Sequence, residues 1–205
     1  MSLAWLGEPQ PTTGIRLPDC LYLLPRPHIG FIRSCLPSEL HVMPPTLTRI
    51  DISKEYLNFS AGHFTIFSAT ERENLHGHNF QVRCAVTAQV GEDGMAFDYV
   101  LLKRVLKGLC DELDERVLLP ALSPYLRMER ENGLVWVLFG AERIPFLERD
   151  CLPLPIRNVT IEELAALLLA RLIDRPETQG WGIRAIELGV SSGSGQWAFA
   201  QWECE

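Results

Sequence analysis

The chain has 205 residues, 47% of them hydrophobic, and a formal net charge of −7 at pH 7. This length predicts one domain, and the acidic balance argues against a nucleic-acid groove or an anionic membrane as the main partner. No run of 18 apolar residues is present, so no transmembrane helix is expected. The six cysteines show no CxxC spacing and the N-terminus lacks a signal-peptide pattern, which predicts reduced thiols in a cytoplasmic protein.

Residues 1–46 differ in composition from the rest of the chain. They hold eight of the 14 prolines, which block regular elements. They also contain an apolar stretch at residues 21–32 that is too hydrophobic for a solvated tail. We expect a proline-rich extension packed irregularly on the domain or on a neighbouring subunit. A disordered extension is the alternative.

Three histidines, His63, His76 and His78, lie close together in the sequence. Residues 48–63 and 78–90 both have strand-like alternation of apolar and polar residues. Residues two apart on a strand face the same side, so His76 and His78 can reach one point, and a hairpin would bring His63 beside them. Three imidazoles with an open fourth position are typical of a catalytic zinc site. The alternative is that these are ordinary strand histidines.

Two helices are expected in the second half of the chain. The first begins near Asp98, a favourable N-cap, and has apolar residues at helical spacing. The second begins at Thr160, where the stretch from Thr160 to Glu163 has the pattern of a capping box.

The remaining segments predict strands. Residues 134–146 have the pattern of a β-hairpin between the two helices. Residues 181–190 and 196–203 are expected to close the sheet, joined by a loop of serines and glycines. The fold class is therefore α+β: a four-stranded antiparallel sheet with two helices on one face.

The stretch from Phe59 to His63 and the stretch from Leu75 to Phe80 resemble the 6-pyruvoyl-tetrahydropterin synthase and 6-carboxy-tetrahydropterin synthase family. The resemblance covers residues 47–205, with an insertion at about 120–157. It implies the tunnelling fold, a bound Zn²⁺, a pterin substrate and a homo-hexamer of two stacked trimers. Closure between subunits would also protect the free edges of a small sheet.

Most members of the resembled family use a cysteine just before the histidine pair as the proton-moving group. This chain has no cysteine there, and a charged loop from Thr70 to Asn74 takes its place. Glu71 resembles the glutamate that replaces cysteine in one subgroup, and Glu73 is the reserve candidate. A carboxylate can act as a base if its pKa is raised towards neutrality. The alternative is that both glutamates are solvated loop charges.

The resemblance also implies a relay of aspartate and histidine after the first helix. Asp114 matches the aspartate, whereas Glu115 stands at the position of the histidine. A carboxylate does not relay protons at neutral pH as an imidazole does. The alternative is a charged helix end without a catalytic role.

For substrate binding, the resemblance implies a glutamate that anchors the pterin on the strand before the last hairpin. Ser191 stands at that position, and the nearest carboxylate is Glu187, four residues earlier. Thr160 and Glu162 match a Thr-x-Glu motif whose glutamate lines the pterin site, although capping alone also accounts for Thr160.

Together with these residues, the resemblance implies a zinc-dependent lyase that acts on the side chain of 7,8-dihydroneopterin triphosphate or a related dihydropterin. One alternative is a 6-carboxy-tetrahydropterin synthase of deazapurine (queuosine) biosynthesis, and the missing cysteine argues against it. The other is a non-catalytic, zinc-bearing relative that binds a pterin or purine.

Overall fold

The computed structural model of the chain describes residues 46–204. The predicted proline-rich extension, residues 1–46, therefore lies almost entirely outside the described residues. The region with the family resemblance, residues 47–205, lies within the described residues except for Glu205.

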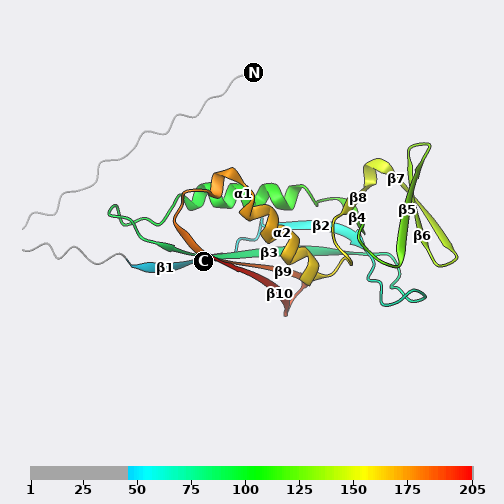
Figure 1. Cartoon of the computed structure of the whole chain (residues 1–205), viewed down its shortest axis with the longest axis horizontal. Helices are drawn as coiled ribbons and strands as arrows, with labels where there is room; N and C mark the ends of the chain where they lie inside the picture. Colours follow the sequence, from blue (N-terminus) through cyan, green and yellow to red (C-terminus); the bar gives the residue numbers. More distant parts are fainter. Residues whose placement is uncertain (1–45, 205) are drawn as a thin grey trace, which may run out of the picture. The chain divides into compact units, whose positions relative to one another are not determined.

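The main sheet has seven strands (Figure 1). They are β1 (Leu47–Ile52), β2 (Asn58–His63), β3 (His76–Gln89), β4 (Arg116–Pro120), β8 (Cys151–Leu154), β9 (Ile183–Gly193) and β10 (Gln196–Glu203). The order is β10-β9-β3-β2-β4-β8, and β1 pairs with β3 beside β2. The long strand β3 is thus the centre of the sheet.

The expected four-stranded antiparallel sheet was wrong in strand number and in part of its pairing. The predicted first strand is interrupted by a turn after Ile52, so β1 and β2 pair with different halves of β3. Strands β4 and β8 add to the sheet in parallel. Pairing between strands so far apart in the chain leaves no local sequence signal, because parallel neighbours share no turn.

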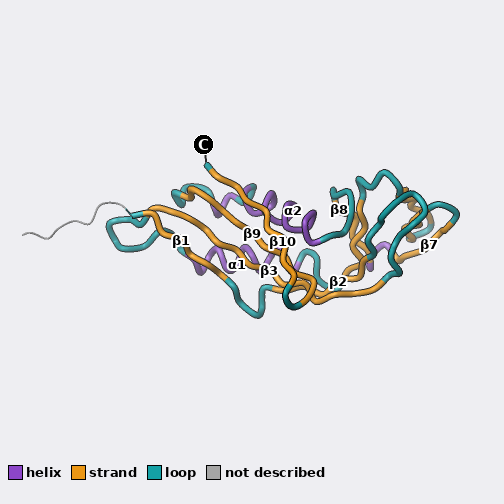
Figure 2. Tube along the Cα trace, turned by 90° about the horizontal axis from the view of Figure 1, so that it is seen from below, coloured by secondary structure: helices purple, strands orange, loops and turns teal. Residues whose placement is uncertain are grey.

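Both helices, α1 (Tyr99–Asp111) and α2 (Ile161–Ile173), cover the same face of the sheet, as Figures 1 and 2 show. Asp98 caps α1 by accepting hydrogen bonds from Val100 and Leu101 amides. Thr160 caps α2, but Glu163 turns to Arg157 instead of completing the capping box. Two short 3-10 turns, η1 (Glu148–Asp150) and η2 (Pro176–Thr178), complete the helical elements. No helix in residues 46–204 is long and apolar enough to cross a membrane.

The core lies between the helices and the inner face of the sheet. Alternate residues of the strands point inward, and β3 contributes Phe80, Val82, Cys84, Val86 and Ala88. The apolar faces of both helices pack on them. Burial of this continuous apolar surface is the main term that stabilises the fold.

A second antiparallel sheet replaces the isolated hairpin that the sequence predicted. It has three strands: β5 (Leu126–Glu131), β6 (Leu134–Phe139) and β7 (Glu142–Leu147). Its inner face forms a separate hydrophobic cluster with Phe64 and Ile66, which follow β2. This sheet therefore packs against the loop between β2 and β3.

Candidate active site

The three histidines lie at one end of the inner face of the main sheet. In the antiparallel pairing of β2 and β3, His63 is directly opposite His76, and Ala61 is opposite His78. All three side chains continue the alternation that places Phe59 and Phe80 in the core. The same alternation that fills the core thus brings the imidazoles together.

Backbone carbonyls orient two of the imidazoles. Nδ1 of His63 lies 3.0 Å from the carbonyl oxygen of Val159, and Nδ1 of His76 lies 2.9 Å from that of Asn74. With Nδ1 as the donor, Nε2 is free to bind a metal, which is the usual role of such outer partners. Nε2 of His76 and Nε2 of His78 are 3.0 Å apart.

The donor set fits a metal ion. The candidate ligand atoms of the three histidines all lie within 4.8 Å of one another. Nε2 of His63 is buried and has no hydrogen-bond partner among the described residues. Burial lowers the pKa of His63, and a neutral imidazole is the form that binds metals. An unpaired buried nitrogen is costly unless an ion or a ligand completes it.

A pocket of about 340 Å³ opens beside the histidines. Its walls include Thr65 and Glu73 from the β2–β3 loop and residues at the start of α2. Oε2 of Glu73 accepts a hydrogen bond of 2.9 Å from the Thr65 amide, and the Glu73 amide donates to the Thr65 carbonyl at 2.8 Å. Glu73 is thereby held at the pocket wall beside the histidines.

The other loop glutamate lies elsewhere. Glu71 is exposed and is not among the residues that line the histidine pocket. Its carbonyl accepts hydrogen bonds from the amides of Phe67 and Ser68, which closes the tip of the loop. The loop thus presents Glu73, the reserve candidate, to the pocket rather than Glu71.

Asp114 and Glu115 do not line the histidine pocket either. Oδ1 of Asp114 accepts a 2.7 Å hydrogen bond from the Ser60 amide, and the Glu115 amide donates to the Ser60 carbonyl at 2.8 Å. Glu115 has a φ of 55°, which is unusual for a residue with a side chain. Within this chain the pair clamps the loop after α1 onto β2.

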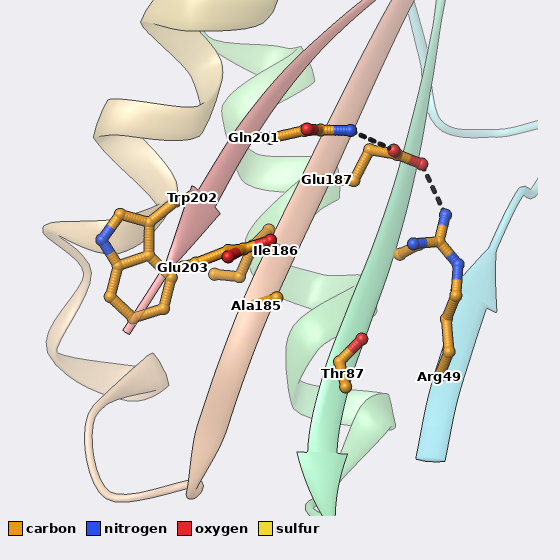
Figure 3. Close-up of a pocket in the computed structure, with 9 residues that line it drawn as sticks. Arg49, Thr87, Ala185, Ile186, Glu187, Gln201, Trp202 and Glu203 are labelled. Carbon is orange, nitrogen blue, oxygen red and sulfur yellow. Dashed lines mark hydrogen bonds and ion pairs between the residues drawn. The ribbon is translucent and has the colours of Figure 1, made fainter. Parts of the chain in front are cut away.

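The candidate pterin anchors on β9 also lie away from the histidines. Figure 3 shows Glu187 on the face of the sheet opposite the helices, bound to Arg49 of β1 and Gln201 of β10. Ser191 is 2% exposed, and its hydroxyl accepts from the amide of Gly193 and donates to the carbonyl of the same residue. Neither residue lines the histidine pocket.

Four other polar residues do line it. Thr160 and Glu162 come from the start of α2, as the resemblance implied, and Ser192 and Gln196 come from the β9–β10 hairpin. Sequence reasoning missed Ser192 and Gln196. The pairing of β9 and β10 is irregular just after Gln196, and such bulges redirect side chains, but they leave no clear signal in a sequence.

None of the four cysteines in residues 46–204 lines the pocket. Cys84, Cys110 and Cys151 are buried in the two hydrophobic clusters, and burial raises the pKa of each thiol. A buried, protonated thiol is a packing group rather than a base. The carboxylates of Glu73 and Glu162 are therefore the candidate acid–base groups in the described pocket, and Glu73 interacts electrostatically with His63 and His76.

The chain is similar to several curated proteins and solved structures. It is 27% identical to the putative 6-carboxy-5,6,7,8-tetrahydropterin synthase of Methanocaldococcus jannaschii over 144 residues. This match covers 69% of this chain and 88% of the relative.

It is 32% identical to the dihydroneopterin monophosphate aldolase of Pyrococcus furiosus over 87 residues. This match covers 42% of this chain and 68% of the relative.

Solved structures show the same fold. The 6-pyruvoyl tetrahydropterin synthase of Plasmodium vivax matches with a TM-score of 0.73 and 26% identity, over 78% of this chain and 99% of that one. A variant of that protein, with a glutamate replaced by alanine, is described as a catalytic-residue mutant. The family model for 6-pyruvoyl tetrahydropterin synthase matches residues 51–201. The chain therefore belongs to the 6-pyruvoyl tetrahydropterin synthase family, whose members process pterins.

Proposed function

We propose that this protein is a zinc-dependent lyase that cleaves the side chain of a phosphorylated 7,8-dihydroneopterin. One observation carries the proposal. Three imidazoles converge on one point, with an unpaired buried nitrogen on His63, in a pocket that the Glu73 carboxylate also lines. A Lewis-acid site beside an ionisable base is what removal of a proton from a side-chain hydroxyl requires.

In this proposal His63, His76 and His78 hold the metal through Nε2. Zinc suits three imidazoles with an open position. When bound, it would polarise the hydroxyl groups of the substrate side chain. The carbonyls of Val159 and Asn74 keep the first two rings in the required orientation.

Glu73 is the proposed base. Burial alone would raise its pKa, but hydrogen bonds from Thr65 and the nearby His76 and His63 outweigh that effect and lower the pKa overall. The pKa is therefore not raised towards neutrality, as was expected of a carboxylate base. Glu73 is ionised at neutral pH, and its place in the histidine pocket supports its choice as the base. One oxygen is held by the Thr65 amide, which leaves the other to accept a proton from the substrate. A glutamate is also the catalytic residue that the P. vivax variant removes, which supports a glutamate as the base in this chain.

The relatives and the pocket support the proposed substrate class. The P. furiosus relative is an aldolase that acts on dihydroneopterin monophosphate. In this chain the carboxylate of Glu162, the hydroxyl of Ser192 and the amide of Gln196 line the wall and are suited to hydrogen bonds with a pterin ring. They stand in for the β9 glutamate that the family resemblance implied at Ser191.

Product analysis with zinc-loaded protein tests the proposal, with 7,8-dihydroneopterin triphosphate and monophosphate as substrates. We expect 6-hydroxymethyl-dihydropterin as the product. Glu73→Gln should lower kcat by about 10²–10⁴ because a general base is removed. Zinc content should not change.

Glu71→Gln is the matched comparison, since it makes the same chemical change in the same loop outside the pocket. It should leave turnover close to wild type. If Glu71→Gln abolished turnover and Glu73→Gln did not, the base would be Glu71. A 6-carboxy product would instead indicate the synthase activity suggested for the M. jannaschii relative. No product from either ester, with tight pterin binding, would indicate a non-catalytic relative.

We also propose that the protein is a homo-hexamer. In the described residues β10 and β8 are the end strands of the main sheet, and free edges favour pairing with another chain. Light scattering at micromolar concentration should give the mass of six chains, and the mass of a single chain would contradict the proposal. Cytoplasmic location stays a prediction.

A further inference from the structure

We propose that Arg72 is a positioning residue that fixes Glu73 and makes its geometry depend on the β5–β7 sheet. This inference rests on the proposed function, in which Glu73 moves a proton. It assigns a catalytic purpose to a sheet that supplies no residue to the lining of the histidine pocket.

The guanidinium of Arg72 donates three hydrogen bonds to two partners. Its Nη1 donates to the Glu73 carbonyl at 2.7 Å. Its Nε donates to Oε2 of Glu142, on β7, at 2.8 Å, and Nη2 donates to the same oxygen. A single guanidinium therefore links the backbone of the base to the first residue of β7.

Aromatic rings hold the guanidinium in place. Its central carbon lies 5.0 Å from the ring centre of Phe64 and 5.8 Å from that of Phe139, the last residue of β6. Cations within about 6 Å of a ring face are attracted to it. The side chain of Arg72 is only 16% exposed, so these contacts are made in a largely desolvated setting.

The backbone transmits this anchoring to Glu73. Arg72 forms an isolated bridge with Ile66, and Glu73 exchanges hydrogen bonds with Thr65 through both its amide and its carboxylate. Ile66 packs in the hydrophobic cluster of the β5–β7 sheet. The two sides of the loop are thus pinned to that sheet at the residues next to the base.

The chemistry of the contact requires arginine. The planar fork directs Nε and Nη2 to a carboxylate while Nη1 points to a carbonyl, and its flat faces lie against the rings. Lysine keeps the charge but offers one nitrogen, which cannot satisfy both partners and the rings together. Arg72→Lys therefore tests geometry rather than charge.

The first test is kinetic, on zinc-loaded full-length protein with the dihydroneopterin ester that it turns over. A misplaced catalytic group can lower the rate by about 10²-fold, and we expect Arg72→Lys to lower kcat by about tenfold or more. Glu142→Gln should have a smaller effect, about threefold to tenfold, because its carboxylate is half exposed. KM and zinc content should stay close to wild type, since neither residue lines the pocket.

Glu131→Gln is the matched control. Glu131 forms an ion pair of 3.3 Å with Arg143 in the same three-stranded sheet, and its exposure, 59%, is close to the 51% of Glu142. Within residues 46–204 its carboxylate forms no hydrogen bond or ion pair with the β2–β3 loop. This control should leave kcat unchanged.

A double-mutant cycle separates positioning from a general loss of structure. In the Glu73→Gln background the Glu142→Gln change should alter kcat by less than about twofold, because the group it positions is gone. Full additivity of the two losses would overturn the proposal.

Hydrogen exchange gives a readout that does not depend on turnover. The amides of Thr65 and Glu73 should exchange faster in Arg72→Lys and Glu142→Gln than in Glu131→Gln. Unchanged exchange and unchanged kcat in Arg72→Lys would overturn the positioning role, while loss of activity in Glu73→Gln would leave the proposed function intact. Conversely, faster exchange in Arg72→Lys, together with a wild-type protein that has no lyase activity, would support the coupling and refute the function.

Discussion

The two halves of strand β3 present the same inner face to very different surroundings. In the half from Val82 to Ala88, every second side chain is buried under the two helices. In the half from His76 to His78, the inward side chains are histidines that are only partly buried and border a pocket. One alternation thus produces a core and a candidate metal site on one strand.

The difference between the halves comes from the helices that cover the strand and not from the strand itself. Helix α2 begins at Ile161, and Val159 and Thr160 already border the pocket, so the helical layer ends beside the histidines. Beyond the end of this layer, polar side chains keep contact with the pocket and avoid the cost of burial without a hydrogen-bond partner. The open half can therefore hold ligands, whereas the covered half can hold only apolar groups.

The largest expected effect is in the open half. His76→Ala should abolish turnover and weaken zinc binding by more than the roughly 10–100-fold that loss of an outer hydrogen-bond partner causes. Thermal stability of the metal-free protein should change little, because His76 is partly exposed. Metal analysis after gel filtration measures the loss.

Asn79→Ala is the control for His76→Ala, since Asn79 lies on the same strand and is exposed on the opposite face. It should retain zinc. Full zinc occupancy in His76→Ala would show that the open half is not a metal site.

A change in the core next to the covered half should have the opposite effect, with a loss of stability rather than a loss of zinc. Leu188 of β9 is fully buried and pairs with Cys84 of β3. Leu188→Ala should lower the free energy of unfolding by about 2–5 kcal/mol, because it removes apolar contacts and leaves a cavity. Urea denaturation measures this. A stable variant that had lost its zinc would contradict the division between the halves.

A change at the boundary between the two halves should have a moderate effect on stability. Ser60 of β2 lies between the core residues Phe59 and Ala61, and its amide donates a hydrogen bond to the Asp114 carboxylate. Asp114→Ala should lower the free energy of unfolding by about 1–2 kcal/mol through loss of a hydrogen bond to a charged group. Asp114→Asn, which keeps an acceptor, should recover most of it. A loss of kcat without a loss of stability in Asp114→Asn would instead favour the relay role.

The smallest effect is expected next to that clamp. Glu115 has a φ of 55°, where a side chain is strained and glycine is not. Glu115→Gly should raise the free energy of unfolding by up to about 1 kcal/mol. Asn132, with a φ of 53°, is the comparison, because asparagine already tolerates this conformation and should gain less. A marked loss of stability in Glu115→Gly would show that the carboxylate itself is needed.

Much of the open half could be predicted from the sequence. The spacing of His76 and His78 and the alternation around His63 predicted that the three imidazoles meet, and the structure places their ligand atoms within 4.8 Å of one another. The N-caps at Asp98 and Thr160 were also predictable, because capping is a local interaction between residues two or three apart.

Which of Glu71 and Glu73 lines the histidine pocket could not be predicted, because a loop has no periodicity to indicate which side chains point inward. In the structure the Thr65 amide binds the Glu73 carboxylate, and Arg72 ties the loop to β7. No local sequence pattern predicts that β4 and β8 join the sheet in parallel. The same holds for Ser192 and Gln196, which line the pocket. Strand alternation and helix caps could be identified from the sequence alone, because they depend on residues close together in the chain. The set of polar groups that share the pocket emerges only in the folded chain, because it depends on contacts between segments far apart in the sequence.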